Sequence, residues 1–195
     1  MEQKTFALKG NIIYTKERTR FEVMEQGWLV CEEGRVRDVY SVLPEELKGI
    51  PVEDMEDRLI IPGLTDLHIH APQYTFRSLG MDMELLEWLE TNTFPEESKY
   101  KDAEYAKKAY EMFAEQLKKS ATVRACIFGT IHNEATLILM DLLEEAGLHT
   151  MVGKVNMDRN SPDYLCEPSA EASAQATREW LKAVADRKYK HTRPI

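Results

Sequence analysis

Segments typical of strands alternate with segments of helical periodicity from Arg58 onward, and this order constrains the fold more than any other feature of the sequence. The expected strands are short and apolar, and longer amphipathic segments separate them. A strand followed by a helix and then by another strand normally forms a parallel pair, with the helix packed on one face of the sheet. The sequence therefore predicts an α/β fold built on a parallel sheet.

The elements of this region can be placed by residue range. Apolar runs predict strands at residues 64–70, 124–131 and 150–157. Apolar residues spaced by three and four predict helices at residues 100–119, 134–146 and 169–185. A strand-helix-strand unit takes about 30 residues, whereas a closed eight-stranded barrel takes about 250. The region holds three such units and part of a fourth, so it is either a small open sheet or the first part of a larger barrel.

The residues before this region predict strands joined by turns. Phe6 to Tyr14 is rich in β-forming residues, and Glu32-Glu33-Gly34 separates two further β-rich runs as in a hairpin. This change in the predicted secondary structure divides the chain into a β-rich region at residues 1–61 and an α/β region at residues 62–195.

The segment Pro62-Gly-Leu-Thr-Asp-Leu-His-Ile-His70 carries the strongest chemical signal. In a regular strand Asp66, His68 and His70 would point to one face, since alternate residues do so. A parallel strand buried on both faces is normally almost wholly apolar. Three polar side chains there would cost desolvation that only a ligand or a hydrogen-bond network offsets. We therefore expect a metal ion held by the two histidines; the alternative is that neighbouring carbonyl groups satisfy them.

This strand resembles the first barrel strand of the amidohydrolase superfamily. Five other segments resemble the guanine deaminase branch of that superfamily in their order and spacing. They are Ala71-Pro-Gln73, Leu85-Leu-Glu-Trp-Leu89, Thr93-Phe-Pro-Glu96, Thr130-Ile-His132 and Val152-Gly-Lys-Val-Asn-Met-Asp158. The resemblance covers about residues 58–195 and implies an N-terminal β-sandwich portion followed by the first strands and helices of a (β/α)8 barrel, which is incomplete in this chain.

The resemblance also implies roles for particular residues. His68 and His70 would be the first two ligands of a zinc ion, with iron as the alternative metal. Gln73 would hydrogen-bond the purine, which suits a side chain with both a donor and an acceptor. His70 and Trp88 would contact the substrate too, and Phe94 is a further aromatic candidate for the pocket wall. No acid or base for catalysis is expected before Ile195.

Weaker candidates for the pocket or its surroundings are four polar residues. Asp66 is expected to orient a histidine or the strand end, as carboxylates around metal sites do. His132 follows the second expected strand, on the side where barrels of this type keep their sites. Asn156 and Asp158 are expected at the end of the third strand, whereas Lys154 is expected to be structural.

The function implied by the resemblance is deamination of guanine to xanthine and ammonia. Because the family draws its other metal ligands from later strands, we expect this chain to be inactive alone and the complete protein to be a homodimer. Three alternatives stay open. The first is another deaminase or a chlorohydrolase of the superfamily. The second is a non-catalytic association module, and the third is a small open-sheet protein with structural histidines.

Composition narrows the classes of partner. The chain has 195 residues and a net charge of −9, which disfavours nucleic acid and anionic membranes as partners. No apolar stretch approaches the roughly 18 residues of a membrane span. Three widely spaced cysteines, Cys31, Cys126 and Cys166, predict reduced and mostly buried thiols in a cytoplasmic protein.

Overall fold

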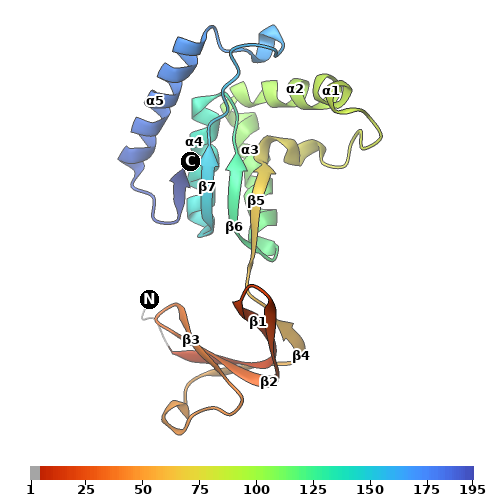
Figure 1. The fold of residues 1–195 in the computed structure, drawn as a ribbon. Helices are drawn as coiled ribbons and strands as arrows, with labels where there is room; N and C mark the ends of the chain where they lie inside the picture. The colour runs from red at the N-terminus through yellow and green to blue at the C-terminus, as the bar shows by residue number, and fades with distance from the viewer. Residues whose placement is uncertain (1–4) are drawn as a thin grey trace. The chain divides into compact units, whose positions relative to one another are not determined.

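A computed structural model describes residues 5–195, which form two compact units (Figure 1). One unit ends at Pro62 and the other spans Gly63–Ile195. Each unit has its own four-stranded sheet.

The first unit is a sheet with the strand order β3-β2-β1-β4. The strands are β1 (Phe6–Glu17), β2 (Arg20–Glu32), β3 (Arg35–Tyr40) and β4 (Val52–Ile60). β1 and β2 are antiparallel, as are β2 and β3, whereas β4 runs parallel to β1. The predicted hairpin is confirmed: Glu33 and Gly34 join β2 to β3 with φ angles of 50° and 72°. Both residues are left-handed, as a type I′ turn requires.

The core of this unit is small. Its buried hydrophobic residues are Ala7, Ile12, Val30 and Leu47, and Leu47 belongs to a short 3-10 turn, η1 (Glu45–Leu47). Phe21 and Val42 are more than two-thirds exposed, at 71% and 77%. The described part of the unit is thus a single sheet with substantial apolar surface in contact with solvent.

The second unit contains the predicted parallel sheet. Its strands lie in the order β5-β6-β7-β8, and all three neighbouring pairs are parallel (Figure 1). They are β5 (Leu64–His70), β6 (Thr122–Phe128), β7 (His149–Gly153) and β8 (Thr192–Pro194). The α/β class that was predicted from the order of elements is confirmed.

Three long helices connect these strands, and each begins or ends at a capping residue. α3 (Ala103–Lys119) begins after Asp102, whose carboxylate accepts from the amide of Glu104 at 2.9 Å. α4 (Asn133–Ala146) ends at Gly147, which has a φ of 73°. α5 (Ala170–Arg187) begins after Ser169, whose hydroxyl accepts from the amide of Ala172.

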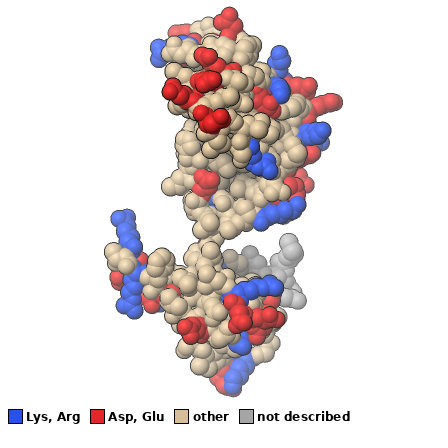
Figure 2. All heavy atoms as spheres, turned by 90° about the vertical axis from the view of Figure 1, so that its right-hand side faces the viewer, with Lys and Arg blue, Asp and Glu red and all other residues tan. Residues whose placement is uncertain are grey.

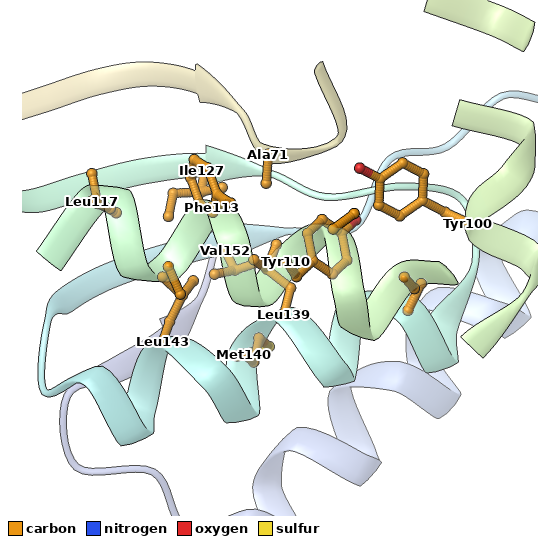
Figure 3. Packing of buried hydrophobic residues seen from close by; sticks show 14 of the residues in the cluster. Ala71, Tyr100, Tyr110, Phe113, Leu117, Ile127, Leu139, Met140, Leu143 and Val152 are labelled. Atoms are coloured by element: carbon orange, nitrogen blue, oxygen red, sulfur yellow. The ribbon is translucent and has the colours of Figure 1, made fainter. Parts of the chain in front are cut away.

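Two of these helices bury one face of the sheet (Figure 3). The predicted apolar stripe of α3 is buried, from Ala106 to Leu117. α4 adds Leu139, Met140 and Leu143 to the buried cluster that also contains Ile127 and Val152 of the sheet. Burial of one such aliphatic side chain stabilises the fold by about 1.5–3 kcal/mol. On α5, Trp180 and Val184 are buried, whereas Leu181 is 43% exposed.

The strands end earlier than the sequence predicted. β6 ends at Phe128 and β7 ends at Gly153, so the residues that follow them form loops at the carboxyl edge of the sheet. β5 leads into a 3-10 turn, η2 (Ala71–Phe76), and then into a broken helix. This helix consists of α1 (Leu85–Trp88), a π-helical turn η3 (Leu89–Thr93), α2 (Phe94–Glu97) and a 3-10 turn η4 (Ser98–Lys101). A last 3-10 turn, η5 (Asp163–Leu165), lies between β7 and α5.

The surface carries charges of both signs. On the side shown in Figure 2, acidic and basic side chains both occur on each unit, with uncharged surface between them. The cysteines are unpaired and half-buried, whereas mostly buried thiols were expected. Among the described residues, no helix is both long enough and apolar enough to cross a membrane.

Candidate active site

The end of β5 brings two imidazole rings together. The Nε2 atoms of His68 and His70 lie 3.2 Å apart, and the ring centroids are 5.1 Å apart. His68 is exposed and His70 is half-buried. Burial, together with the nearby His68, lowers the pKa of His70, which favours its neutral form. A neutral imidazole has a lone pair to offer a metal ion.

The two rings rest on a third aromatic side chain. Phe128 ends β6 and pairs with His70 in the ladder. Its ring stacks on the His70 ring at a centroid distance of 4.5 Å and an angle of 9°, and it lies 4.8 Å from the His68 ring. The contact limits ring rotation and keeps both Nε2 atoms turned toward each other. The alternation of residues in β6 alone predicts only a core position for Phe128, and its place at the end of the strand beside β5 is the signal for this contact.

The separation of the two nitrogens fits ligands of one metal ion. Bonds of about 2.1 Å place two nitrogens about 3.4 Å apart at the tetrahedral angle and about 3.0 Å apart at a right angle. The observed 3.2 Å lies between these values. The same distance also permits an N–H···N hydrogen bond between two neutral rings. Within residues 5–195, no third histidine, cysteine or carboxylate joins the pair to complete a metal-binding group.

Regular alternation predicted that Asp66 and His70 point to the same face of the sheet. In the structure they point to opposite faces. The ladder between β5 and β6 shifts between Asp66 and Ile69, so Asp66 pairs with Ala125 and His70 pairs with Phe128. Ala125 and Phe128 are three positions apart and therefore point to opposite faces. The Asp66 carboxylate accepts from the backbone amide of His68 at 3.0 Å. This bond fixes the strand where it bulges, immediately before the histidines.

An open cleft of about 610 Å³ adjoins the histidine pair. Gln73 and Trp88 line it, as do His68 and His70. Volumes of about 300–1,000 Å³ are typical of small-molecule sites. The indole Nε1 of Trp88 donates to the carbonyl of Leu79 at 2.9 Å, so the ring wall is fixed in place. The cleft therefore combines aromatic walls with a few polar groups.

Two residues of this region were not singled out from the sequence, and one predicted residue lies elsewhere. Arg77 lines the cleft and stacks its guanidinium over the Tyr74 ring at 4.1 Å. Glu97 is only 5% exposed and hydrogen-bonds Gln73. Burial raises the pKa of Glu97 to about 7, against a smaller lowering by that hydrogen bond. Phe94 lines a different pocket, beside Pro162 and Tyr164.

The turn that carries Gln73 is clamped by the helix that follows it. Glu96 accepts from the Thr75 hydroxyl at 2.9 Å and also from Tyr105 and Lys99. The Tyr100 hydroxyl, which is buried, donates to the carbonyl of Pro72 at 3.1 Å. These bonds hold η2 against α2 and η4, and so fix the backbone on both sides of Gln73.

The weaker candidates do not all face the cleft. The Nε2 atom of His132 is buried and has no hydrogen-bond partner among residues 5–195. Burial, followed by the nearby charges of Lys154 and Lys101, lowers the pKa of His132. Asn156 lies in the loop beyond β7, and its amide donates to Ser173 and to Thr177 of α5.

Lys154 and Glu167 form a buried ion pair in the same loop region. The Lys154 ammonium donates to Glu167 at 2.7 Å, and the Glu167 carboxylate also accepts from the Met157 amide at 2.9 Å and the Ser173 hydroxyl at 2.7 Å. Because these groups satisfy the lysine, its predicted structural role agrees with the contacts. Asp158 is half-buried in this loop, and its predicted role stays a prediction.

Comparison with known proteins assigns a family. The model of the Amidohydrolase family matches residues 59–193. The guanine deaminase of Dictyostelium discoideum is 33% identical over 193 residues, and the match covers 90% of this chain and 43% of that protein. The guanine deaminase of Escherichia coli K12 is 34% identical over 165 residues, with 82% of this chain and 36% of that protein covered.

A solved structure agrees with these matches. A crystal structure of guanine deaminase from C. acetobutylicum, with guanine bound in its active site, superimposes with a TM-score of 0.90 at 41% identity. The superposition covers 98% of this chain and 45% of that one. This chain therefore spans less than half the length of the relatives that it matches.

Proposed function

The chain belongs to the amidohydrolase family, and we propose that it forms the N-terminal part of a metal-dependent deaminase that converts guanine to xanthine and ammonia. The observation that carries this proposal is the 3.2 Å separation of the His68 and His70 Nε2 atoms beside a cleft of suitable size. The similarity to three guanine deaminases supports guanine as the substrate.

The proposal includes the finer architecture. The first unit, at residues 1–61, would be one part of a β-sandwich, and its exposed apolar side chains such as Phe21 and Val42 support a further covering layer. Residues 62–195 would supply the first strands and helices of a (β/α)8 barrel. The complete protein would be a homodimer.

His68 and His70 would hold the metal through their Nε2 atoms. We propose zinc, because two imidazoles suit it, with iron as the alternative. When bound, the metal would lower the pKa of a coordinated water and so supply the nucleophile for hydrolysis at neutral pH. Phe128 would keep both rings in place, and Asp66 would hold the strand through the His68 amide. The pair supplies two ligands, whereas a catalytic zinc site normally has three from the protein.

Gln73 and Trp88 would orient the purine. The Gln73 amide offers a donor and an acceptor to an edge that has both, and the hydrogen bond with Glu97 restricts its rotation. The Trp88 ring would form an apolar wall for the base. Hydrolysis would break the bond between C2 and its exocyclic nitrogen, which leaves as ammonia.

The test measures release of ammonia from guanine by this chain alone and after mixing with the part of the C. acetobutylicum guanine deaminase that follows the matched region. We expect no turnover by the chain alone and turnover by the mixture. The His68→Ala/His70→Ala variant should abolish it, whereas His149→Ala, a histidine away from the cleft, should not.

Two alternatives have distinct outcomes in the same assay. Another deaminase or a chlorohydrolase would prefer a different amino- or chloro-substituted ring over guanine. A non-catalytic association module would form a complex with the added polypeptide but show no turnover, and it would purify without stoichiometric zinc. Turnover that is unchanged in His68→Ala/His70→Ala would contradict the proposal.

A further inference from the structure

A carboxyl group is buried behind the cleft of the candidate active site. Glu97 of α2 is only 5% exposed, and its carboxylate accepts a hydrogen bond from the side-chain amide of Gln73 in η2. Gln73 also lines the cleft beside His68 and His70. The Gln73 amide therefore lies between a buried acceptor and the space that a ligand would fill.

Hydrogen bonds on both sides of Gln73 hold its backbone in place. Glu96 accepts from the Thr75 hydroxyl at 2.9 Å, and the Tyr100 hydroxyl donates to the carbonyl of Pro72 at 3.1 Å. The turn is thus attached to the following helix one residue before Gln73 and two residues after it. With the backbone fixed, the remaining freedom is rotation of the side chain, which decides whether the oxygen or the nitrogen of the amide faces the buried carboxyl group.

The two sides of a glutamine amide are chemically opposite. Its outer edge presents the carbonyl oxygen beside one N–H, and the second N–H points sideways. An ionised carboxyl group accepts hydrogen bonds but cannot donate them. Ionised Glu97 therefore takes the second N–H of Gln73 and fixes the order in which the oxygen and the first N–H face the cleft. The reversed order would set the Gln73 oxygen against the Glu97 carboxylate, and two acceptors repel each other.

The buried hydroxyl groups around Glu97 do not replace Gln73 as donors. Thr93 lies four residues before Glu97, and Tyr110 is near enough that burial, followed by the nearby Tyr100 and Glu97, raises its pKa. Within residues 5–195, neither the Thr93 hydroxyl nor the Tyr110 hydroxyl has a hydrogen-bond partner, so neither bonds the carboxyl group. Because a buried carboxylate without a donor is destabilised, the bond from Gln73 favours one order of the amide.

We infer that Glu97 is a positioning residue, which holds the Gln73 amide in the one order that pairs with a 6-oxopurine and mispairs with a 6-aminopurine. A 6-oxopurine such as guanine has an N–H at N1 beside a carbonyl oxygen. A 6-aminopurine such as adenine exchanges the two, with an acceptor at N1 beside an amino group. The inference rests on the proposed function for the identity of the ligand, because guanine as the substrate decides which order is the productive one.

The orientation of Gln73 relaxes when Glu97 takes up a proton. Burial raises the pKa of Glu97 to about 7, against a smaller lowering by the Gln73 hydrogen bond. Above that pH the carboxylate permits one order, whereas below it the protonated group can also donate to the Gln73 oxygen. Tyr100 of η4 and Tyr110 of α3 face this carboxyl group, and burial raises the pKa of each, so both stay neutral between pH 6 and pH 8. Although burial opposes the change, hydrogen bonds lower the pKa of Glu96, which stays ionised over this range.

The first measurement follows Gln73 in the full chain without any ligand. Nitrogen-15 and proton NMR of the Gln73 amide reports its orientation from pH 6 to pH 8, and the carbon-13 shift of the Glu97 carboxyl group reports ionisation. We expect both signals to change with a common midpoint. In Glu97→Gln, which cannot ionise, the Gln73 signals should not vary with pH. Glu104→Gln, at an exposed position of α3, is the matched control and should follow wild type.

The second measurement compares the affinities of the full chain for hypoxanthine and adenine, which exchange donor and acceptor at N1 and position 6. Neither has an amino group at C2, so neither can undergo the proposed reaction. Shifts of the indole signal of Trp88, which lines the cleft, give the dissociation constants. At pH 8 we expect hypoxanthine to bind about tenfold more tightly than adenine, because adenine leaves two hydrogen bonds mispaired. The ratio should fall below about threefold at pH 6, and at both pH values in Glu97→Leu, because both orders of the amide are then accessible.

Circular dichroism of each variant checks that the fold is retained. Gln73 signals that do not follow the ionisation of Glu97 would overturn the inference. A ratio that stays at the wild-type value in Glu97→Leu, or that does not vary with pH in wild type, would overturn it as well. Failure of both purines to bind, with the coupled titration of Gln73 and Glu97 intact, would contradict the proposed purine site and not the orientation of Gln73 by Glu97.

Discussion

Glu97 makes the stability of the second unit depend on pH in a predictable direction. Its carboxyl group is buried, and burial raises its pKa from 4.5 to about 7. Between these two values the folded chain keeps a proton that the unfolded chain has released. The free energy of unfolding contributed by this group therefore falls as pH rises from 4.5 to about 7, and stays low above that. The difference between the two pKa values corresponds to about 3 kcal/mol.

The perturbation is Glu97→Gln, which keeps the shape of the side chain and its ability to hydrogen-bond Gln73 but cannot ionise. Guanidinium denaturation at several pH values from 4.5 to 8, followed by tryptophan fluorescence, gives the free energy of unfolding. Trp88 and Trp180 both report on this unit. We expect the stability of the variant relative to wild type to increase by about 3 kcal/mol between pH 4.5 and pH 8.

In the difference between variant and wild type, the contributions of the other titrating groups to the free energy of unfolding cancel. His70 and His132, whose pKa values are lowered, act in the opposite direction but are present in both proteins. Glu104→Gln, at an exposed position of α3, is the control and should follow wild type at every pH. A stability difference for Glu97→Gln that does not vary with pH would refute the reasoning.

Two further predictions concern packing and the loop after β7. Lys154→Met should lower the free energy of unfolding at pH 7 by about 3–5 kcal/mol, because it leaves the Glu167 carboxylate buried without its cation. Lys154→Met/Glu167→Leu should recover most of that loss in the same denaturation assay; no recovery would contradict the ion-pair explanation. Leu139→Ala should cost about 3 kcal/mol, since Leu139 is fully buried, whereas a cost below about 1 kcal/mol would show that the site collapses around the cavity.

Much of the second unit was predictable because its signals are local. The three helices were predicted from apolar residues three and four positions apart, and α3, α4 and α5 lie close to the predicted ranges. The parallel arrangement of the strands also follows from the alternation of elements.

The errors arose where long-range contacts set the local structure. The bulge after Asp66 depends on the register with β6, so the sequence of β5 alone predicted the wrong face for Asp66. β7 ends early because Glu167, from a later loop, accepts hydrogen bonds from the Lys154 ammonium and the Met157 amide. Regular alternation cannot anticipate either contact.

In the candidate site, too, features set by local sequence were predicted and features set by long-range contacts were not. His68 and His70 were identified from their spacing along one strand, and Gln73 from the resemblance to a family. Glu97 was missed because its burial depends on the packing of α2 against η2, and Phe128 because its role depends on register. Residues that act through a neighbour leave little trace in the sequence.

The central claim is that the His68 and His70 rings together bind a metal ion. Nitrogen-15 NMR of the histidine rings during titration with zinc tests it directly in this chain. We expect the Nε2 resonances of both rings to shift together and to saturate at one equivalent, with modest affinity because only two protein ligands are present. His149→Ala/His191→Ala should leave these shifts unchanged. Absence of any shift at His68 and His70, or identical zinc binding by His68→Ala/His70→Ala, would contradict the account.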